Sequence, residues 1–191
     1  MRNGPVKPAF NRQAATVTSV IADKLKMAEP FFSDLSVIVV DDVRATRSIL
    51  KALLRNLGIQ KVVEAGDGAE ALEILQGQRK DLVITDLSMA PINGIELTRQ
   101  LRQPKNPNAF VPVLMISAHN ERTRIKEAVA AGVSAFLLKP VTPITLMKKL
   151  RALIEQPIPV VRAGSYHGPD RRRRAAWVGK DRRSTPSDFL I

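Results

Sequence analysis

The chain of 191 residues carries 30 basic and 18 acidic side chains, a formal net charge of +12, and no cysteine. The lack of cysteine excludes disulfides and thiolate metal sites. No apolar run approaches the roughly 20 residues that span a bilayer, and the opening stretch "MRNGPVKPAFNRQAAT" lacks the apolar region of a secretory signal. We therefore expect a cytoplasmic protein with one ordinary domain and additional flanking segments.

The positive charge is densest at the two ends of the chain. Residues 1–33 hold five basic and two acidic side chains, residues 34–156 hold 17 and 13, and residues 157–191 hold eight and three. Basic flanks of this kind indicate an anionic partner such as a nucleic acid, a nucleotide or a membrane surface. A solvated tail that aids solubility is an equally weighted alternative.

The first flank, residues 1–33, contains one pattern typical of an amphipathic helix, at 12–28. Such a helix would pack on the domain or on a second copy of the chain as a homodimer, or stay a weakly ordered arm.

The central segment, residues 34–156, alternates strand and helix patterns. Strands are predicted at 36–41, 61–65, 81–86, 111–117 and 134–139, and helices at 45–58, 67–77, 92–103, 121–132 and 142–155. Thr142 is placed as the N-cap of the last helix and Pro143 at its first position. This alternation predicts an α/β fold, a doubly wound parallel sheet with helices on both faces and right-handed crossovers.

The last segment, residues 157–191, begins with "PIPV" and is rich in Gly, Pro, Ser and Arg, so little regular structure is expected there. "GPDRRR" (168–173) recurs as "GKDRRS" (179–184), and Trp177 lies between the two copies.

Polar side chains converge on one edge of the predicted sheet, because ligands bind beyond the carboxyl ends of parallel strands. The residues delivered there are Asp41 and Asp42 after the first strand, Asp86 after the third, Ser117 after the fourth, and Lys139 with Pro140 after the fifth. A single acid in such a position often caps the next helix. The joint arrangement is far more specific, because each residue lies at the same end of its strand.

Three clustered carboxylates repel one another unless a hard cation joins them. Mg²⁺ takes carboxylate oxygens, keeps water ligands and favours phosphate as a further ligand. A carboxylate beside Mg²⁺ can attack phosphorus and form an aspartyl phosphate. Lys139 would then neutralise charge on the phosphoryl oxygens and Ser117 would donate a hydrogen bond to one of them.

The segment 34–156 resembles the receiver domain of bacterial two-component response regulators, the family of the single-domain chemotaxis regulator. The resemblance rests on "VIVVDDVRATRSIL", "DLVITDLSMAPINGIEL", "VLMISAHN" and "GVSAFLLKP", which follow the order of the family and cover about two-thirds of the chain. It implies a flavodoxin-like fold with strand order 2-1-3-4-5. It also implies a phosphoacceptor that receives its phosphoryl group from a sensor histidine kinase or a histidine phosphotransfer protein, and that is not an enzyme beyond its own dephosphorylation.

The resemblance also implies a role for each matching residue. Asp86 matches the phosphoacceptor, Asp42 the direct Mg²⁺ ligand, Asp41 its water-mediated neighbour, and the carbonyl of Ser88 a third protein ligand. Ser117 and Phe136 match the switch pair, Lys139 the phosphoryl partner, and Lys139-Pro140 a cis peptide. One departure is that Pro91 follows Met89 with Ala90 between them, which predicts a local change in the loop beside an intact site.

No effector domain is expected in residues 157–191, so the sequence favours a stand-alone receiver that signals by contact with a downstream protein. The arginines Arg171, Arg172, Arg173, Arg174, Arg182 and Arg183 suit phosphate or carboxylate groups. A nucleotide, a nucleic acid, an acidic protein face or the acidic edge of its own receiver would each satisfy them. A regulator acting through nucleotide or nucleic-acid binding by this tail is the alternative function. A Mg²⁺-dependent phosphohydrolase is disfavoured, because it needs an acid where Ser88 stands.

Overall fold

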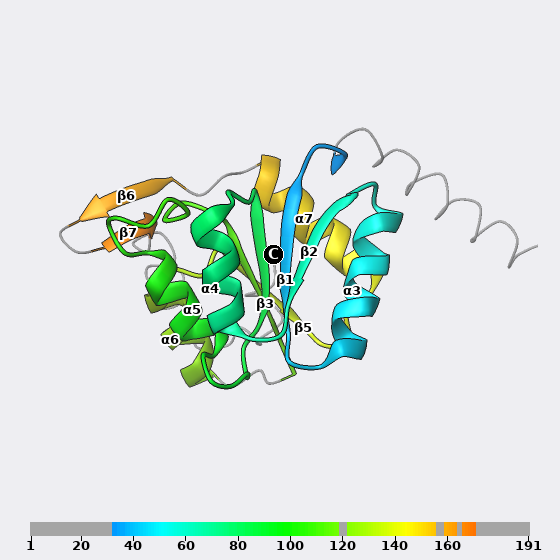
Figure 1. Cartoon of the computed structure of the whole chain (residues 1–191), viewed down its shortest axis with the longest axis horizontal. Helices are drawn as coiled ribbons and strands as arrows, with labels where there is room; N and C mark the ends of the chain where they lie inside the picture. Colours follow the sequence, from blue (N-terminus) through cyan, green and yellow to red (C-terminus); the bar gives the residue numbers. More distant parts are fainter. Residues whose placement is uncertain (1–31, 119–121, 156–158, 164–165, 171–191) are drawn as a thin grey trace, which may run out of the picture.

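A five-stranded parallel sheet forms the centre of the molecule (Figure 1). This computed structural model describes residues 32–118, 122–155, 159–163 and 166–170. The strands of the sheet are β1 (Ser36–Val40), β2 (Lys61–Ala65), β3 (Leu82–Asp86), β4 (Val113–Ser117) and β5 (Ala135–Leu138). Their order is β2-β1-β3-β4-β5 and every pairing among them is parallel. The predicted flavodoxin-like order is therefore confirmed.

Helices cover both faces of this sheet (Figure 1). One face carries α3 (Arg44–Asn56) and α7 (Pro143–Glu155), and the other carries α4 (Gly68–Gly77), α5 (Gly94–Leu101) and α6 (Arg122–Ala131). Neighbouring strand residues enter different cores: Val39 packs with the α3 and α7 side chains, and Val40 with those of α4, α5 and α6. Side chains alternate along a strand, so a strand covered on both faces is mainly apolar, as residues 37–40 of β1 are.

Local signals set the ends of the helices within two residues of the predicted bounds. Thr142 caps α7 through its hydroxyl, which accepts a hydrogen bond from the Thr145 backbone N–H at 3.2 Å, and Asn93 caps α5 in the same way. Gly58 and Gly132 follow α3 and α6 with φ angles of 92° and 100°. This left-handed conformation ends helices and favours glycine.

The expectation of little regular structure after residue 156 is wrong for the start of that segment. Strands β6 (Val160–Ala163) and β7 (Tyr166–Pro169) form a two-stranded antiparallel sheet, and the Asp170 N–H donates to the Pro159 carbonyl at 2.7 Å. The sequence between the strands is Gly-Ser, a pair typical of two-residue hairpin loops. Val160 and Val161, at the start of β6, favour a strand. The abundance of Gly, Pro and Arg in the segment led to the opposite prediction.

The hairpin follows α7 and lies at the upper left of Figure 1, on the side of the molecule where the sheet strands begin. The site residues predicted from the sequence lie at the opposite, carboxyl edge. The predicted helix at 12–28 and the arginines of 171–174 and 182–183 fall outside the described residues. Within the described ranges, no helix is both long enough and apolar enough to cross a membrane.

Candidate functional site

The carboxyl ends of β1, β3, β4 and β5 bring the predicted site residues together. Val40 pairs with Thr85 and Asp86 pairs with Ile116, so Asp41, Asp86 and Ser117 follow one another across the sheet. Ser117 in turn pairs with Leu138, and the Lys139 N–H donates to the Ser117 carbonyl at 2.8 Å. Parallel pairing thus brings four residues that are far apart in the sequence to one edge of the sheet.

Asp41 and Asp86 each hold the turn that follows their strand. The Asp41 Oδ1 atom accepts a hydrogen bond from the Val43 N–H at 2.9 Å, and the Asp86 Oδ2 atom accepts one from the Ser88 N–H at 2.7 Å. Both are carboxylate contacts to the backbone two residues on, typical of turns led by Asp. In each residue the second oxygen faces the site, so each acid serves the turn and the site together.

Lys139 lies between these two acids. Its Nζ atom is 2.6 Å from Asp86 Oδ1 and 3.2 Å from Asp41 Oδ2. Asp41 is 1% exposed and Asp86 is 8% exposed, so the ammonium compensates two carboxylates that are almost out of water. Burial lowers the pKa of Lys139, but the hydrogen bonds and charges of Asp86 and Asp41 outweigh it, and the pKa is raised above its usual 10.5.

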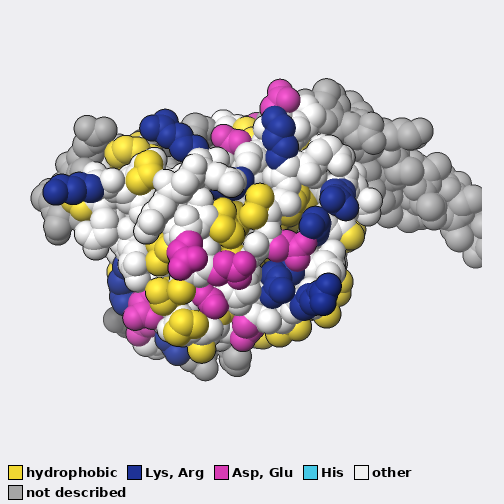
Figure 2. Space-filling model, in the orientation of Figure 1, with side chains coloured by type: hydrophobic (Ala, Val, Ile, Leu, Met, Phe, Trp, Pro, Cys, Tyr) yellow, Lys and Arg dark blue, Asp and Glu magenta, His cyan; other side chains and the backbone are white. Residues whose placement is uncertain are grey.

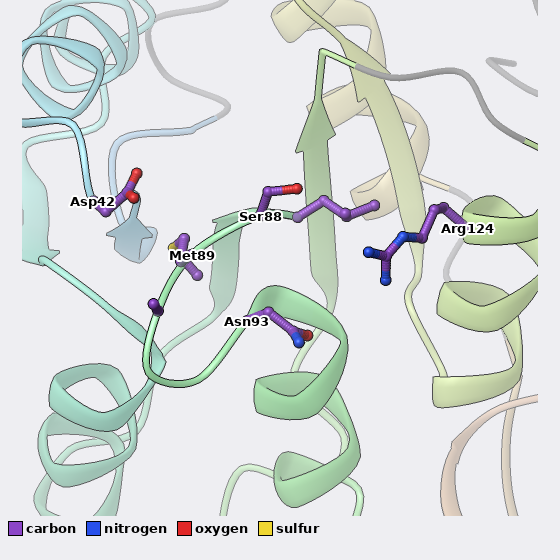
Figure 3. Close-up of a pocket in the computed structure, with 7 residues that line it drawn as sticks. Asp42, Ser88, Met89, Asn93 and Arg124 are labelled. Carbon is purple, nitrogen blue, oxygen red and sulfur yellow. The ribbon is translucent and has the colours of Figure 1, made fainter.

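Asp42 directly follows Asp41, and Ser88 is the second residue after Asp86. Both side chains are exposed, and both line a pocket of about 390 Å³ together with Leu87, Met89, Ala90, Asn93 and Arg124. Figure 3 shows Asp42 on one side of this pocket, Ser88 near its middle and Arg124 of α6 on the other side. The structure therefore puts the Asp42 carboxylate and the Arg124 guanidinium on opposite walls of this pocket, beside the loop that follows Asp86.

Ser117, on the strand beside Asp86, and Phe136, on the next strand, are both buried, at 2% and 6% exposure. Phe136 belongs to the core between the sheet and helices α4, α5 and α6. Its neighbour in the sheet is Met115, two residues before Ser117 on β4. The Lys139-Pro140 peptide is cis.

The loop after Asp86 contains Met89-Ala90-Pro91, with one residue between methionine and proline that the receiver pattern lacks. The Ala90-Pro91 peptide is also cis, and Met89 is buried while Ala90 and Pro91 are exposed. The extra residue is thus accommodated at the surface of the loop. The Gly94 N–H still donates to the Leu87 carbonyl at 3.2 Å, which closes the loop.

Gly94 allows the start of α5 to pack directly on the end of β3. A Cβ atom at this position would collide with the Asp86 backbone carbonyl and would lie 3.1 Å from Thr85 Oγ1. We expect Gly94→Ala to lower the free energy of unfolding by about 2 kcal/mol or more, since overpacking against backbone typically costs 1–3 kcal/mol. Urea unfolding measures it. Gly77→Ala is the matched control, because a Cβ there meets nothing within 4 Å, and an equal loss at both positions would contradict the prediction.

Two arginines at this edge escaped the sequence reasoning. Arg47 of α3 donates from Nη1 to the Asp41 backbone carbonyl at 2.6 Å, and Arg124 lines the pocket beside Ser88. Both lie in helices with several other basic residues, so nothing in the local pattern distinguishes them. His119, which the sequence places near the site, lies outside the described residues.

The charges of the site fit a divalent cation. Among the site residues predicted from the sequence, the three carboxylates of Asp41, Asp42 and Asp86 outnumber the one ammonium of Lys139, and such oxygen donors suit Mg²⁺. Figure 2 shows acidic side chains gathered across the lower half of the visible face, toward the same edge. No group of three or more His, Cys, Asp or Glu in the described part of the chain is already arranged around a metal position.

Comparison with known proteins gives one consistent result. The model of the response regulator receiver domain matches residues 37–151. The chemotaxis protein CheY-3 of Vibrio cholerae is 39% identical over 123 residues, which is 64% of this chain and 94% of that protein. The structure of Vibrio cholerae CheY4 is 32% identical with a TM-score of 0.58, covering 61% of this chain and 96% of that one.

A further solved structure has a metal in its site. The receiver domain of the Pseudomonas aeruginosa sensor histidine kinase PA1611, with a magnesium ion coordinated in its active-site cleft, is 25% identical. Its TM-score is 0.58, and the match covers 64% of this chain and 98% of that one. The family model spans more than half of the chain and agrees with the observed strand order. The chain therefore belongs to the response regulator receiver domain family.

Proposed function

We propose that this receiver is phosphorylated on Asp86 and signals through contact with a downstream protein. The observation that carries the proposal is the Lys139–Asp86 pair at 2.6 Å, at the carboxyl edge and beside Asp41. The phosphoryl donor would be a sensor histidine kinase or a histidine phosphotransfer protein. Membership of the receiver family supports this role.

Each residue would contribute a distinct part of the transfer. Asp86 supplies the attacking oxygen. Its carboxylate is held in place by the hydrogen bond from the Ser88 N–H to Oδ2 and by the ion pair of Oδ1 with Lys139. The Lys139 ammonium would then pair with the phosphoryl oxygens, where the negative charge develops. Ser117, buried on the neighbouring strand, donates its hydroxyl to one of these oxygens. Positioning and electrostatics carry such a transfer without a general base.

We assign Mg²⁺ as the cofactor, because the excess negative charge of the site and the oxygen donors match its preferences. Asp42, Asp41, Asp86 and the Ser88 carbonyl would hold it, and the ion would supply positive charge against the phosphoryl oxygens. The magnesium-bound receiver from Pseudomonas aeruginosa supports this assignment.

We expect Asp42→Asn to raise the Mg²⁺ concentration for half-maximal phosphorylation by roughly tenfold, the lower end of the effect of losing a metal-supporting group. The side chain is exposed, so the fold should tolerate the change. The measurement is a Mg²⁺ titration of phosphorylation by a small phosphodonor. Asp34→Asn, another exposed aspartate, is the matched control. An unchanged Mg²⁺ requirement in Asp42→Asn would remove Asp42 from the ligand set.

The signal would leave through Ser117 and Phe136. A phosphoryl group adds about −1.5 to −2 charge, which would draw the Ser117 hydroxyl toward it. The displacement would open space for the buried Phe136 ring and change the surface formed by α6, β5 and α7.

The test of the proposed function is incubation of the full chain with Mg²⁺ and either acetyl phosphate or phosphoramidate, followed by intact mass measurement. We expect a gain of one phosphoryl group that requires Mg²⁺. A protein that gains none from either donor, nor from a histidine kinase, would refute the proposal.

A further inference from the structure

The pocket beside the acceptor has one cationic wall. Of the residues that line it, Arg124 has the only basic side chain and Asp42 the only acidic one. The Asn93 side chain is already engaged, since its Oδ1 atom caps α5 and its Nδ2 atom donates to Glu96 at 3.2 Å. Leu87, Met89 and Ala90 contribute apolar surface. An anion that enters this pocket would therefore be attracted to the Arg124 guanidinium.

Arg124 is presented to the pocket and held only weakly elsewhere. Its side chain is 49% exposed, and its ion pair with Glu127, one turn along α6, is 3.6 Å long between two exposed groups. Such a surface pair contributes little and does not fix the side chain. In Figure 3 the guanidinium extends from α6 toward the acceptor loop. Its planar set of donors suits a carboxylate, which it can bind through two parallel hydrogen bonds.

The geometry of phosphoryl transfer decides which part of a phosphodonor would reach Arg124. The attacking and leaving atoms lie roughly in line on opposite sides of phosphorus. Asp86 attacks from the end of β3, with Lys139 and Asp41 at its inner side. A leaving atom opposite them would point outward, toward the pocket that Ser88, the second residue after Asp86, lines together with Asp42 and Arg124.

The chemistry of the leaving group differs between two small donors. With an acyl phosphate, the Asp86 oxygen forms a bond to phosphorus, the bond from phosphorus to the acyl oxygen breaks, and a carboxylate leaves with the electron pair. With phosphoramidate protonated on nitrogen, the phosphorus–nitrogen bond breaks and neutral ammonia leaves. Negative charge thus develops on the leaving group only in the first case, and only there would a guanidinium stabilise it.

We propose that Arg124 positions the carboxylate leaving group of small acyl phosphates, and so gives this receiver a preference for them over phosphoramidate. The inference rests on the proposed role of Asp86 as phosphoacceptor and adds a substrate preference to it. Arg124 would act as a positioning residue for the donor and would not bind the transferred phosphoryl group.

The experiment compares phosphorylation rate constants of the full chain with acetyl phosphate and with phosphoramidate, at fixed Mg²⁺ and ionic strength. The variants are Arg124→Gln and, as control, Lys126→Gln, which removes the same charge from the same helix at an exposed position that does not line the pocket. Arg124→Gln should slow the reaction with acetyl phosphate by about fivefold, the upper end for an exposed ion pair. Its reaction with phosphoramidate should stay within about twofold of wild type, and Lys126→Gln should change neither.

The two donors make each variant its own folding control, because a misfolded protein would lose both reactions. An equal loss with both donors, or no loss with either, would overturn the role of Arg124 and leave Asp86 as the phosphoacceptor. A loss with acetyl phosphate in Lys126→Gln equal to that in Arg124→Gln would reduce the effect to net charge and would also overturn it. A wild-type protein that accepts from neither small donor would overturn this inference, and it would refute the proposed function as well only if a histidine kinase also fails to phosphorylate it.

Discussion

Asp86→Asn is expected to abolish the gain of a phosphoryl group completely. The amide keeps the size and shape of the side chain, and its oxygen still accepts the hydrogen bond that the Ser88 N–H donates to Asp86 at 2.7 Å. It is too weak a nucleophile to attack phosphorus. The measurement is intact mass after incubation with Mg²⁺ and acetyl phosphate, beside wild type and wild type without Mg²⁺.

The control for this experiment is Asp34→Asn, which makes the same chemical change at an exposed aspartate just before β1. That variant should be phosphorylated like wild type. A Mg²⁺-dependent gain of one phosphoryl group in Asp86→Asn would show that another residue accepts it, and normal signalling by this variant would refute the proposed mechanism.

Lys139→Met is expected to destabilise the protein and to make its stability depend strongly on Mg²⁺. Removing the ammonium leaves Asp41 and Asp86 facing each other without their shared partner. Losing one partner of a fully buried ion pair costs 3–5 kcal/mol. Because the Lys139 side chain is 30% exposed, we expect a loss of about 1–3 kcal/mol in the free energy of unfolding without a divalent cation.

Urea unfolding with EDTA and with Mg²⁺ measures this effect. Mg²⁺ should restore part of the stability of Lys139→Met, because it supplies the positive charge that the variant lacks. The control is Lys80→Met, which removes another partly buried lysine, one that contacts Ser36 and Gln78. If Mg²⁺ stabilised both variants and wild type alike, the prediction that Mg²⁺ replaces the missing positive charge of Lys139 would be wrong.

The raised pKa of Lys139 also determines how the difference in free energy of unfolding between wild type and Lys139→Met depends on pH. A lysine with a raised folded-state pKa contributes stability that is fully present below its usual value of 10.5 and is lost as the pH rises through the folded-state value. The stability difference between wild type and Lys139→Met should therefore be constant through the neutral range and shrink only above that value.

The fold and most of the site were predictable from the sequence because both depend on local patterns. Strands buried on both faces are largely continuous apolar runs, so the apolar residues of "SVIVV" and "LVITD" predicted β1 and β3 correctly. Parallel connections then put every residue that follows a strand at one edge. This alone brought Asp86, Ser117 and Lys139 together before any contact was known.

The tertiary structure alone decided how those side chains meet. Lys139 and Asp41 are 98 residues apart, and no local pattern states that one ammonium lies between two acids. The same holds for Arg124, whose place on the pocket wall depends on how α6 packs against α5. The sequence analysis did not predict the hairpin of β6 and β7, because glycine and arginine are frequent around it. The hairpin forms through the pairing of two short strands. Sequence periodicity records which face of each element is buried, whereas distances between side chains on different elements arise only when those faces pack.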